Sequence, residues 1–168
     1  ISEKGFEIFL DLKLHDIPNT VANSVRKISN FNVALTTIHL NGGKDMIEAA
    51  SSEKGNIKIL GVSILTSLSE NDIFEITHTE FDAYFNNLIS IASNTNVDGV
   101  VCSPNELDKL KNFNKLKVVP GIRKDNSDDD QKRVMSPMEA YQKGADFIVV
   151  GRPITKSEDP RKALELFL

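Results

Sequence analysis

The sequence predicts an α/β fold built on a parallel sheet. Short apolar segments of strand length, rich in Val, Ile and Leu, recur along the chain, and stretches with helical spacing separate them. These segments are nearly continuous in apolar residues, which is typical of parallel strands covered on both faces. The six predicted strands lie in FEIFLDLKL (6–14), ALTTIHL (34–40), IKILGVSIL (57–65), VDGVVCS (97–103), KLKVVPG (115–121) and ADFIVVG (145–151).

Helices are predicted between these strands. Pro18 is suited to open the first of them, and two later segments begin with Ser-Pro followed by an acidic residue, SPNELDKLKNF (103–113) and SPMEAYQKG (136–144), a pattern typical of helix starts. Apolar side chains at helical spacing follow Pro18 at Val21, Ala22, Val25 and Ile28, and within residues 81–93 at Phe81, Tyr84, Phe85, Leu88 and Ile91.

The number of strands indicates a particular architecture. A closed (β/α)8 TIM barrel has eight strands and typically about 250 residues, whereas this chain has 168 residues and six predicted strands. The opening ISEKG is typical of the last turn of a helix, with Gly5 as its cap. We therefore expect residues 1–168 to form a single domain that carries about the last six βα units of a TIM barrel, the first two units not being in the sequence given.

The composition disfavours several classes of function. The formal net charge is −4, whereas a nucleic-acid or anionic-membrane surface would favour a basic face. No apolar run approaches the ~20 residues needed to span a bilayer, and the N-terminus does not have the pattern of a signal peptide. Cys102 is the only cysteine, which fits a reducing compartment. These features predict a cytoplasmic protein that binds neither nucleic acid nor membranes.

The segment FLDLKLHDIPNT (9–20) places charges inside an apolar strand. Because side chains alternate along a strand, Asp11 and Lys13 are expected on one face, and Ile8, Leu10, Leu12 and Leu14 on the other. Asp16 follows on the loop after the strand, at the end where barrel enzymes place their active sites. A buried ion pair with a purely structural role is the alternative, but such pairs are poor stabilisers because desolvation offsets their attraction. We therefore expect a catalytic site here.

Two later strand ends have a composition suited to phosphate. VVPGIR ends with Gly121 and Arg123, and FIVVGRP ends with Gly151 and Arg152. Glycine permits close approach of a ligand, and arginine offers forked donors to phosphate oxygens. The polar segment KDNSDDDQKRVMSP (124–137) is long for a βα connection and is predicted to be a lid, with Asp128, Asp129 and Asp130 facing solvent. The alternative for the arginines is a surface ion pair.

Taken together, FLDLKLHDIPNT, GVSILTSL, DGVVCS, VVPGIR, DQKRVMSP and FIVVGRPI closely resemble the bacterial type of orotidine 5′-phosphate decarboxylase, from Gly5 to the C-terminus. The D-x-K-x-x-D element is shared with related sugar-phosphate enzymes, but HDIPNT with PGIR and VGRPI is specific to the nucleotide enzyme. The resemblance implies the cofactor-free and metal-free decarboxylation of orotidine 5′-phosphate to UMP in de novo pyrimidine synthesis.

The resemblance also implies roles for individual residues. Lys13 would protonate carbon 6 of the pyrimidine beside Asp11, and Asp16 would complete the catalytic set from the neighbouring subunit of a homodimer. Thr66 and Ser67 would contact the substrate, with Ser67 near the pyrimidine amide. The implied substrate-binding set is Asp11, Lys13, Asp16, Ile17, Thr20, Thr66, Ser67, Pro120, Arg123, Gln131, Gly151 and Arg152, with Gln131 on the lid between base and phosphate.

Two family features have no counterpart in this sequence, namely an aspartate on the first strand that binds ribose and a lysine on the second that pairs with Asp11. Two alternatives remain open: a magnesium-dependent sugar-phosphate decarboxylase or synthase on the same barrel, and an inactive, truncated barrel that only binds nucleotides. His15 and Cys102 are expected to be structural, and so is His39, for which the alternative is a place on the floor of the cavity.

Overall fold

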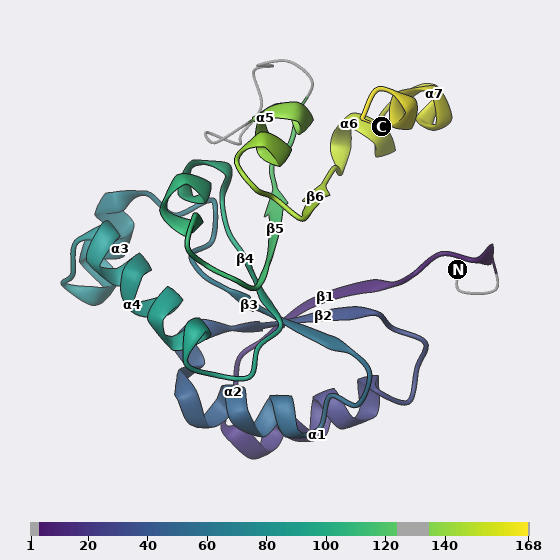
Figure 1. Cartoon of the computed structure of the whole chain (residues 1–168). Coiled ribbons are helices and arrows are strands. Elements are labelled where there is room, and N and C mark those ends of the chain that lie inside the picture. The colour runs from purple at the N-terminus through teal and green to yellow at the C-terminus, as the bar shows by residue number, and fades with distance from the viewer. Residues whose placement is uncertain (1–3, 124–134, 168) are drawn as a thin grey trace. The chain divides into compact units, whose positions relative to one another are not determined.

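The computed structural model describes residues 4–123 and 135–167. Its strands follow one another in the order β1-β2-β3-β4-β5-β6, so neighbours in the sequence are neighbours in the sheet (Figure 1). The pairs β1–β2, β2–β3 and β5–β6 are parallel. All six predicted segments therefore contain a strand, at β1 Phe9–Leu14, β2 Leu35–His39, β3 Lys58–Val62, β4 Gly99–Val101, β5 Leu116–Pro120 and β6 Phe147–Val149.

Helices alternate with these strands, as a parallel α/β fold requires. The predicted helices at 81–93 and after Pro18 are confirmed, whereas the segment after Ser103 forms a 3-10 helix rather than an α-helix. The helical elements are α1 Pro18–Ile28, η2 Leu40–Gly42, α2 Gly43–Ser52, α3 Glu70–Thr77, α4 Phe81–Ser93, η3 Pro104–Leu110, α5 Pro137–Gln142, α6 Arg152–Thr155 and α7 Pro160–Glu165. None of the helices in the described part of the chain is long and apolar enough to cross a membrane.

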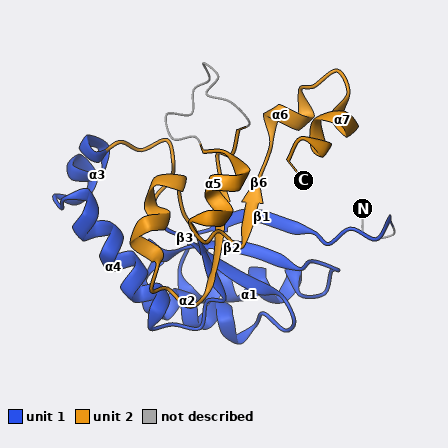
Figure 2. Cartoon of the chain, turned by 45° about the horizontal axis from the view of Figure 1, so that its top comes forward, with its two compact units in different colours: residues 1–63, 70–100 blue, residues 64–69, 101–168 orange. Residues whose placement is uncertain are grey.

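The chain divides into two compact units, coloured separately in Figure 2. Unit 1 comprises residues 1–63 and 70–100, and unit 2 comprises residues 64–69 and 101–168. In unit 1, α1 and α2 lie along the same side of β1 and β2 (Figure 1). Removal of their apolar side chains from water provides the main driving force for this packing. The buried residues on these two helices are Val21, Val25, Ile28, Met46, Ile47 and Ala50.

Unit 2 contains the strands and helices of the C-terminal part of the chain. The helix starts predicted from Ser-Pro are confirmed: Ser136 and Glu139 form a capping box, and the Glu106 carboxylate accepts from the Ser103 backbone N–H at 2.8 Å. Cys102 is buried, as expected for a small apolar residue, and burial raises the pKa of its thiol. Its position and pKa favour a structural role for this cysteine.

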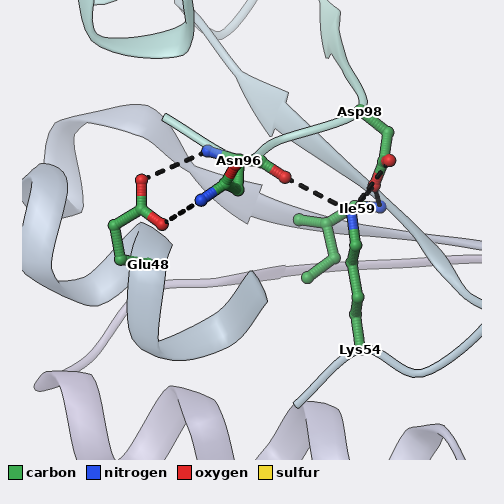
Figure 3. A network of polar contacts seen from close by, with 5 residues as sticks. All are labelled: Glu48, Lys54, Ile59, Asn96 and Asp98. Atoms are coloured by element: carbon green, nitrogen blue, oxygen red, sulfur yellow. Dashed lines mark hydrogen bonds and ion pairs between the residues drawn. The ribbon is translucent and has the colours of Figure 1, made fainter. Parts of the chain in front are cut away.

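A polar network in unit 1 joins the start of β3 to the turn before β4 (Figure 3). Lys54 Nζ donates to both carboxylate oxygens of Asp98, at 2.8 and 2.7 Å, and the Ile59 amide donates to Asp98 Oδ2 at 2.8 Å. Glu48 accepts from the backbone and side-chain nitrogens of Asn96, at 3.2 and 2.6 Å. These bonds lie at the N-terminal ends of the strands, the side of such sheets that serves stability rather than catalysis.

Candidate active site

The first strand is irregular at the predicted site. Leu10 pairs with Thr36 and Leu14 with Ile38, so four steps along β1 (10 to 14) face two along β2 (36 to 38). Lys13 lies within this bulge and has a φ of 50°. A non-glycine residue in the left-handed region costs about 1–3 kcal/mol, and such residues cluster at functional sites. The bulge therefore changes the direction in which side chains leave the strand at this end of β1.

The bulge also corrects one expectation from the sequence. Strict alternation predicted that Leu12 would share a covered face with Ile8, Leu10 and Leu14, but Leu12 is 48% exposed. The prediction is wrong because the extra residues interrupt the two-residue period on which it relied.

Asp11 and Lys13 nevertheless lie together, as predicted. The Lys13 ammonium donates to Asp11 Oδ2 at 2.5 Å, and the two side chains are 38% and 43% exposed, respectively. The purely structural alternative required a buried pair. A half-exposed pair at a strand end is instead open to a ligand.

Thr37, on β2, connects both members of this pair and was missed by sequence reasoning. Its hydroxyl donates to Asp11 Oδ1 at 2.7 Å and accepts from the Lys13 backbone N–H at 2.8 Å. The neighbouring Thr36 hydroxyl donates to the Leu10 carbonyl at 2.8 Å. The only signal in the sequence was a pair of threonines in an otherwise apolar strand.

Two histidines lie beside the pair. The ring centroids of His15 and His39 are 5.3 Å apart. Burial lowers the pKa of His39 below its usual value; the nearby His15 and Lys13 lower it further, while Asp11 acts in the opposite direction. This shift favours the uncharged form of the His39 imidazole.

The segment from Asp16 to Thr20 leads from the site into α1. Asp16 Oδ1 accepts from the Ile17 backbone N–H at 2.7 Å, and the Thr20 N–H donates to the Ile17 carbonyl at 3.0 Å. All five residues of the segment are exposed, Ile17 by 66%. Ile17 is therefore a large exposed apolar side chain between Asp16 and Thr20, two polar residues of the predicted site.

The remaining described site residues lie in unit 2. Thr66 and Ser67 follow β3, in the segment 64–69, where Thr66 is half-buried and Ser67 exposed. They therefore belong to a different compact unit from the Asp11–Lys13 pair, which lies in unit 1.

Pro120 ends β5, and Gly121 follows with a φ of 80°, a conformation that favours glycine. Arg123 is only 6% exposed; its Nη1 donates to the Ile122 carbonyl at 2.9 Å. Gly151 precedes α6 in an open setting, because a Cβ added there would have no heavy atom within 4 Å.

Arg152 is the first residue of α6 and is half-buried. Gln131 and the three aspartates of the predicted lid lie outside the described residues. Among residues 4–123 and 135–167, no group of three or more His, Cys, Asp or Glu side chains is arranged to hold a metal ion.

Comparisons with known proteins give a consistent match. The model of the orotidine 5′-phosphate decarboxylase / HUMPS family matches residues 1–167. The orotidine 5′-phosphate decarboxylase of Aquifex aeolicus is 48% identical over 167 residues, which are 95% of this chain and 72% of that protein. That of Ehrlichia chaffeensis is 44% identical over 172 residues, 98% of this chain and 74% of the relative.

A solved structure shows the same relation in three dimensions. The crystal structure of orotidine 5′-phosphate decarboxylase from Lactobacillus acidophilus superimposes with a TM-score of 0.85 at 35% identity, covering 99% of this chain and 75% of that one. The chain thus spans about three quarters of the length of the proteins it matches. The six-stranded arrangement is that part of a TIM barrel, as the sequence predicted.

Proposed function

Because the chain belongs to the orotidine 5′-phosphate decarboxylase / HUMPS family, we propose that Lys13 and Asp11 carry out its chemistry. The activity is that of a carbon–carbon lyase: orotidine 5′-phosphate loses CO2 and takes up a proton to give UMP in pyrimidine synthesis. The observation that carries the proposal is the Asp11–Lys13 contact of 2.5 Å at the carboxyl end of β1.

The chemistry requires a fixed positive charge. When the bond from carbon 6 to the carboxylate breaks, its electron pair stays on carbon 6 in the plane of the ring, where the ring does not delocalise it. A preorganised ammonium attracts this developing carbanion more than it attracts the neutral carbon of the substrate, which lowers the barrier. Lys13 then donates its proton to carbon 6 and regains one from water.

Asp11 orients this ammonium through their ion pair. Its carboxylate would lie beside the departing CO2, in the arrangement that the family resemblance implies. The Lys13 side chain is 38% exposed, so that a substrate ring could approach it. No step in this scheme needs a metal or an organic cofactor.

The other residues are proposed to hold the substrate. Thr66 and Ser67 would contact the pyrimidine, and Pro120, Arg123, Gly151 and Arg152 would group around the substrate and its phosphate. Arginine suits this task because its guanidinium forms paired, charge-assisted bonds with phosphate oxygens. Gln131 would close over the base and phosphate, so that phosphate binding energy helps to organise the reacting end.

We further propose a homodimer in which Asp16 and Thr20 reach the partner's site. The support is the exposure of the whole segment 16–20, with Ile17 as a large apolar side chain in water. In a two-fold dimer, each subunit would bury its copy of this segment in the same contact with its partner.

A cytoplasmic location is also proposed, since Cys102 is a free thiol. Cell fractionation would test it.

The magnesium-dependent alternative is separated by an assay with and without EDTA. We expect purified protein to release CO2 from orotidine 5′-phosphate at the same rate in both conditions, because no proposed step uses a metal. Loss of activity in EDTA with recovery on adding Mg2+ would support the sugar-phosphate class of enzyme. Binding of UMP with no release of CO2 would support the inactive nucleotide-binding barrel.

The shared site is tested by subunit mixing. Lys13→Ala and Asp16→Ala subunits should each be inactive alone, but a mixed dimer contains one site with its own Lys13 and the partner's Asp16 intact. We expect about a quarter of wild-type activity per mixed preparation on statistical grounds, half the dimers being mixed and each having one complete site. If subunit exchange is demonstrated and activity stays absent, each site is formed within one subunit.

A further inference from the structure

Thr37 is buried to 0% exposure in β2, and its hydroxyl is bonded to both residues of the proposed catalytic pair. We propose that Thr37 is a positioning residue for the decarboxylation: it fixes the backbone of Lys13 and the carboxylate of Asp11 at the same time. This inference rests on the proposed function, because it assigns a task within that site. It adds a residue that the charged motif DLKLHD does not contain.

The bonding capacity of a hydroxyl supports this arrangement. A threonine hydroxyl has one proton to donate and lone pairs that accept. The Lys13 backbone N–H can only donate, so the hydroxyl accepts from it, and its own proton is left for Asp11 Oδ1. Asp11 Oδ2 is then free to face the Lys13 ammonium. One hydroxyl thus sets the orientation of the carboxylate and, through it, the position of the ammonium.

The backbone of Lys13 needs such an anchor. The bulge between Leu10 and Leu14 interrupts the regular pairing with β2, and Lys13 has a φ of 50°. The backbone of a residue other than glycine rarely adopts this conformation unless the surroundings hold it there. The bond from the Lys13 N–H to Thr37 ties the irregular segment to a strand whose neighbouring residues are buried.

Thr36 provides a matched comparison within the same strand. It is equally buried, and its hydroxyl also bonds to β1, but the acceptor is the Leu10 carbonyl rather than the pair. Thr36→Val and Thr37→Val therefore remove the same group, a buried hydroxyl that bridges β1 and β2. Only Thr37→Val removes a bond to Lys13 and to Asp11.

The kinetic test compares Thr36→Val, Thr37→Val and Thr37→Ser. We expect kcat of Thr37→Val to fall about 100-fold, the scale expected for an ångström-sized misplacement of a catalytic group, with little change in KM. Thr37→Ser keeps the hydroxyl and should recover most of kcat, and Thr36→Val should stay close to wild type. Equal kcat values for Thr36→Val and Thr37→Val, or a loss in Thr37→Ser as large as in Thr37→Val, would overturn the proposal.

A second readout does not depend on activity. Amide hydrogen exchange of Lys13 should be at least about tenfold faster in Thr37→Val than in wild type, because its acceptor is gone, and unchanged in Thr36→Val. Unchanged exchange in Thr37→Val would show that the hydroxyl does not anchor Lys13, and would overturn the proposal even if kcat fell. Failure of the proposed function looks different: wild type would release no CO2, or Lys13→Ala would remain active.

Discussion

Lys13→Ala is expected to lower kcat for orotidine 5′-phosphate by about 10⁴-fold or more. The variant loses a proton donor, which typically contributes 10²–10⁴-fold, and also the positive charge that stabilises the carbanion, for which single groups contribute about 10²–10³-fold. A φ of 50° is as unfavourable for alanine as it is for lysine, so the substitution adds no backbone strain at this position. The fold should therefore survive, and UMP should still bind.

Lys58→Ala is the matched control for this variant. Lys58 begins β3 with an exposed side chain, and its backbone N–H, which the substitution leaves in place, donates to the Ala34 carbonyl at 2.9 Å. We expect its kcat to stay within about twofold of wild type, as for most surface substitutions. Near-normal turnover by pure Lys13→Ala, with the control behaving as described, would remove Lys13 from the chemistry.

Arg152→Ala is expected to produce the second large effect, on binding of the phosphate. The loss in kcat/KM for orotidine 5′-phosphate should be about 100-fold, which corresponds to about 2.7 kcal/mol and to the loss of charge-assisted hydrogen bonds. The effect on the phosphate-free nucleoside orotidine should be much smaller, since the contact that the variant removes is absent there. The ratio of the two losses in kcat/KM measures the specific contribution of Arg152 to phosphate binding.

Arg161→Ala controls for the loss of a positive charge in the same part of the chain. Arg161 lies in α7 with an exposed side chain, and its removal should change both substrates equally and slightly. Equal losses on both substrates in Arg152→Ala would assign Arg152 to the ring or the fold instead of the phosphate.

Gln131→Ala should also lower kcat/KM more for the nucleotide than for the nucleoside, because its proposed role is in closure over the phosphate.

Much of the fold was predictable because its strands are local patterns. The six apolar segments are readable from composition alone, and the helices at 81–93 and after Pro18 follow from a stripe of buried side chains. The bounds of helix α2 were not predicted, although Met46, Ile47 and Ala50 are buried at helical spacing. The short segment GKDMIEAASS has glycine, serine and charged residues around these three, which weakens the periodic signal.

The site, too, was predictable only where its residues are close in the sequence. Asp11 and Lys13 lie two residues apart, so a local rule could place them together, whereas Thr37 reaches Lys13 across 24 residues. That contact depends on the pairing register of β1 with β2, and the register shifts at a bulge that no local pattern revealed. The same bulge explains why the local rule failed for Leu12. The role of Thr66 came from family resemblance alone, and the roles of Asp16 and Arg152 came from their places at strand ends together with that resemblance. All three stay predictions.

The central claim is that this chain replaces the carboxylate on carbon 6 with a proton, and the fate of that proton can be measured directly. Purified wild-type protein should convert orotidine 5′-phosphate in D2O to UMP that carries one carbon-bound deuterium, located at carbon 6, for each CO2 released, because the Lys13 ammonium exchanges its protons with solvent before it donates one. Mass spectrometry gives the number of deuterons, and proton NMR gives their position. Absence of UMP from folded protein, or deuterium at another ring position, would contradict the account.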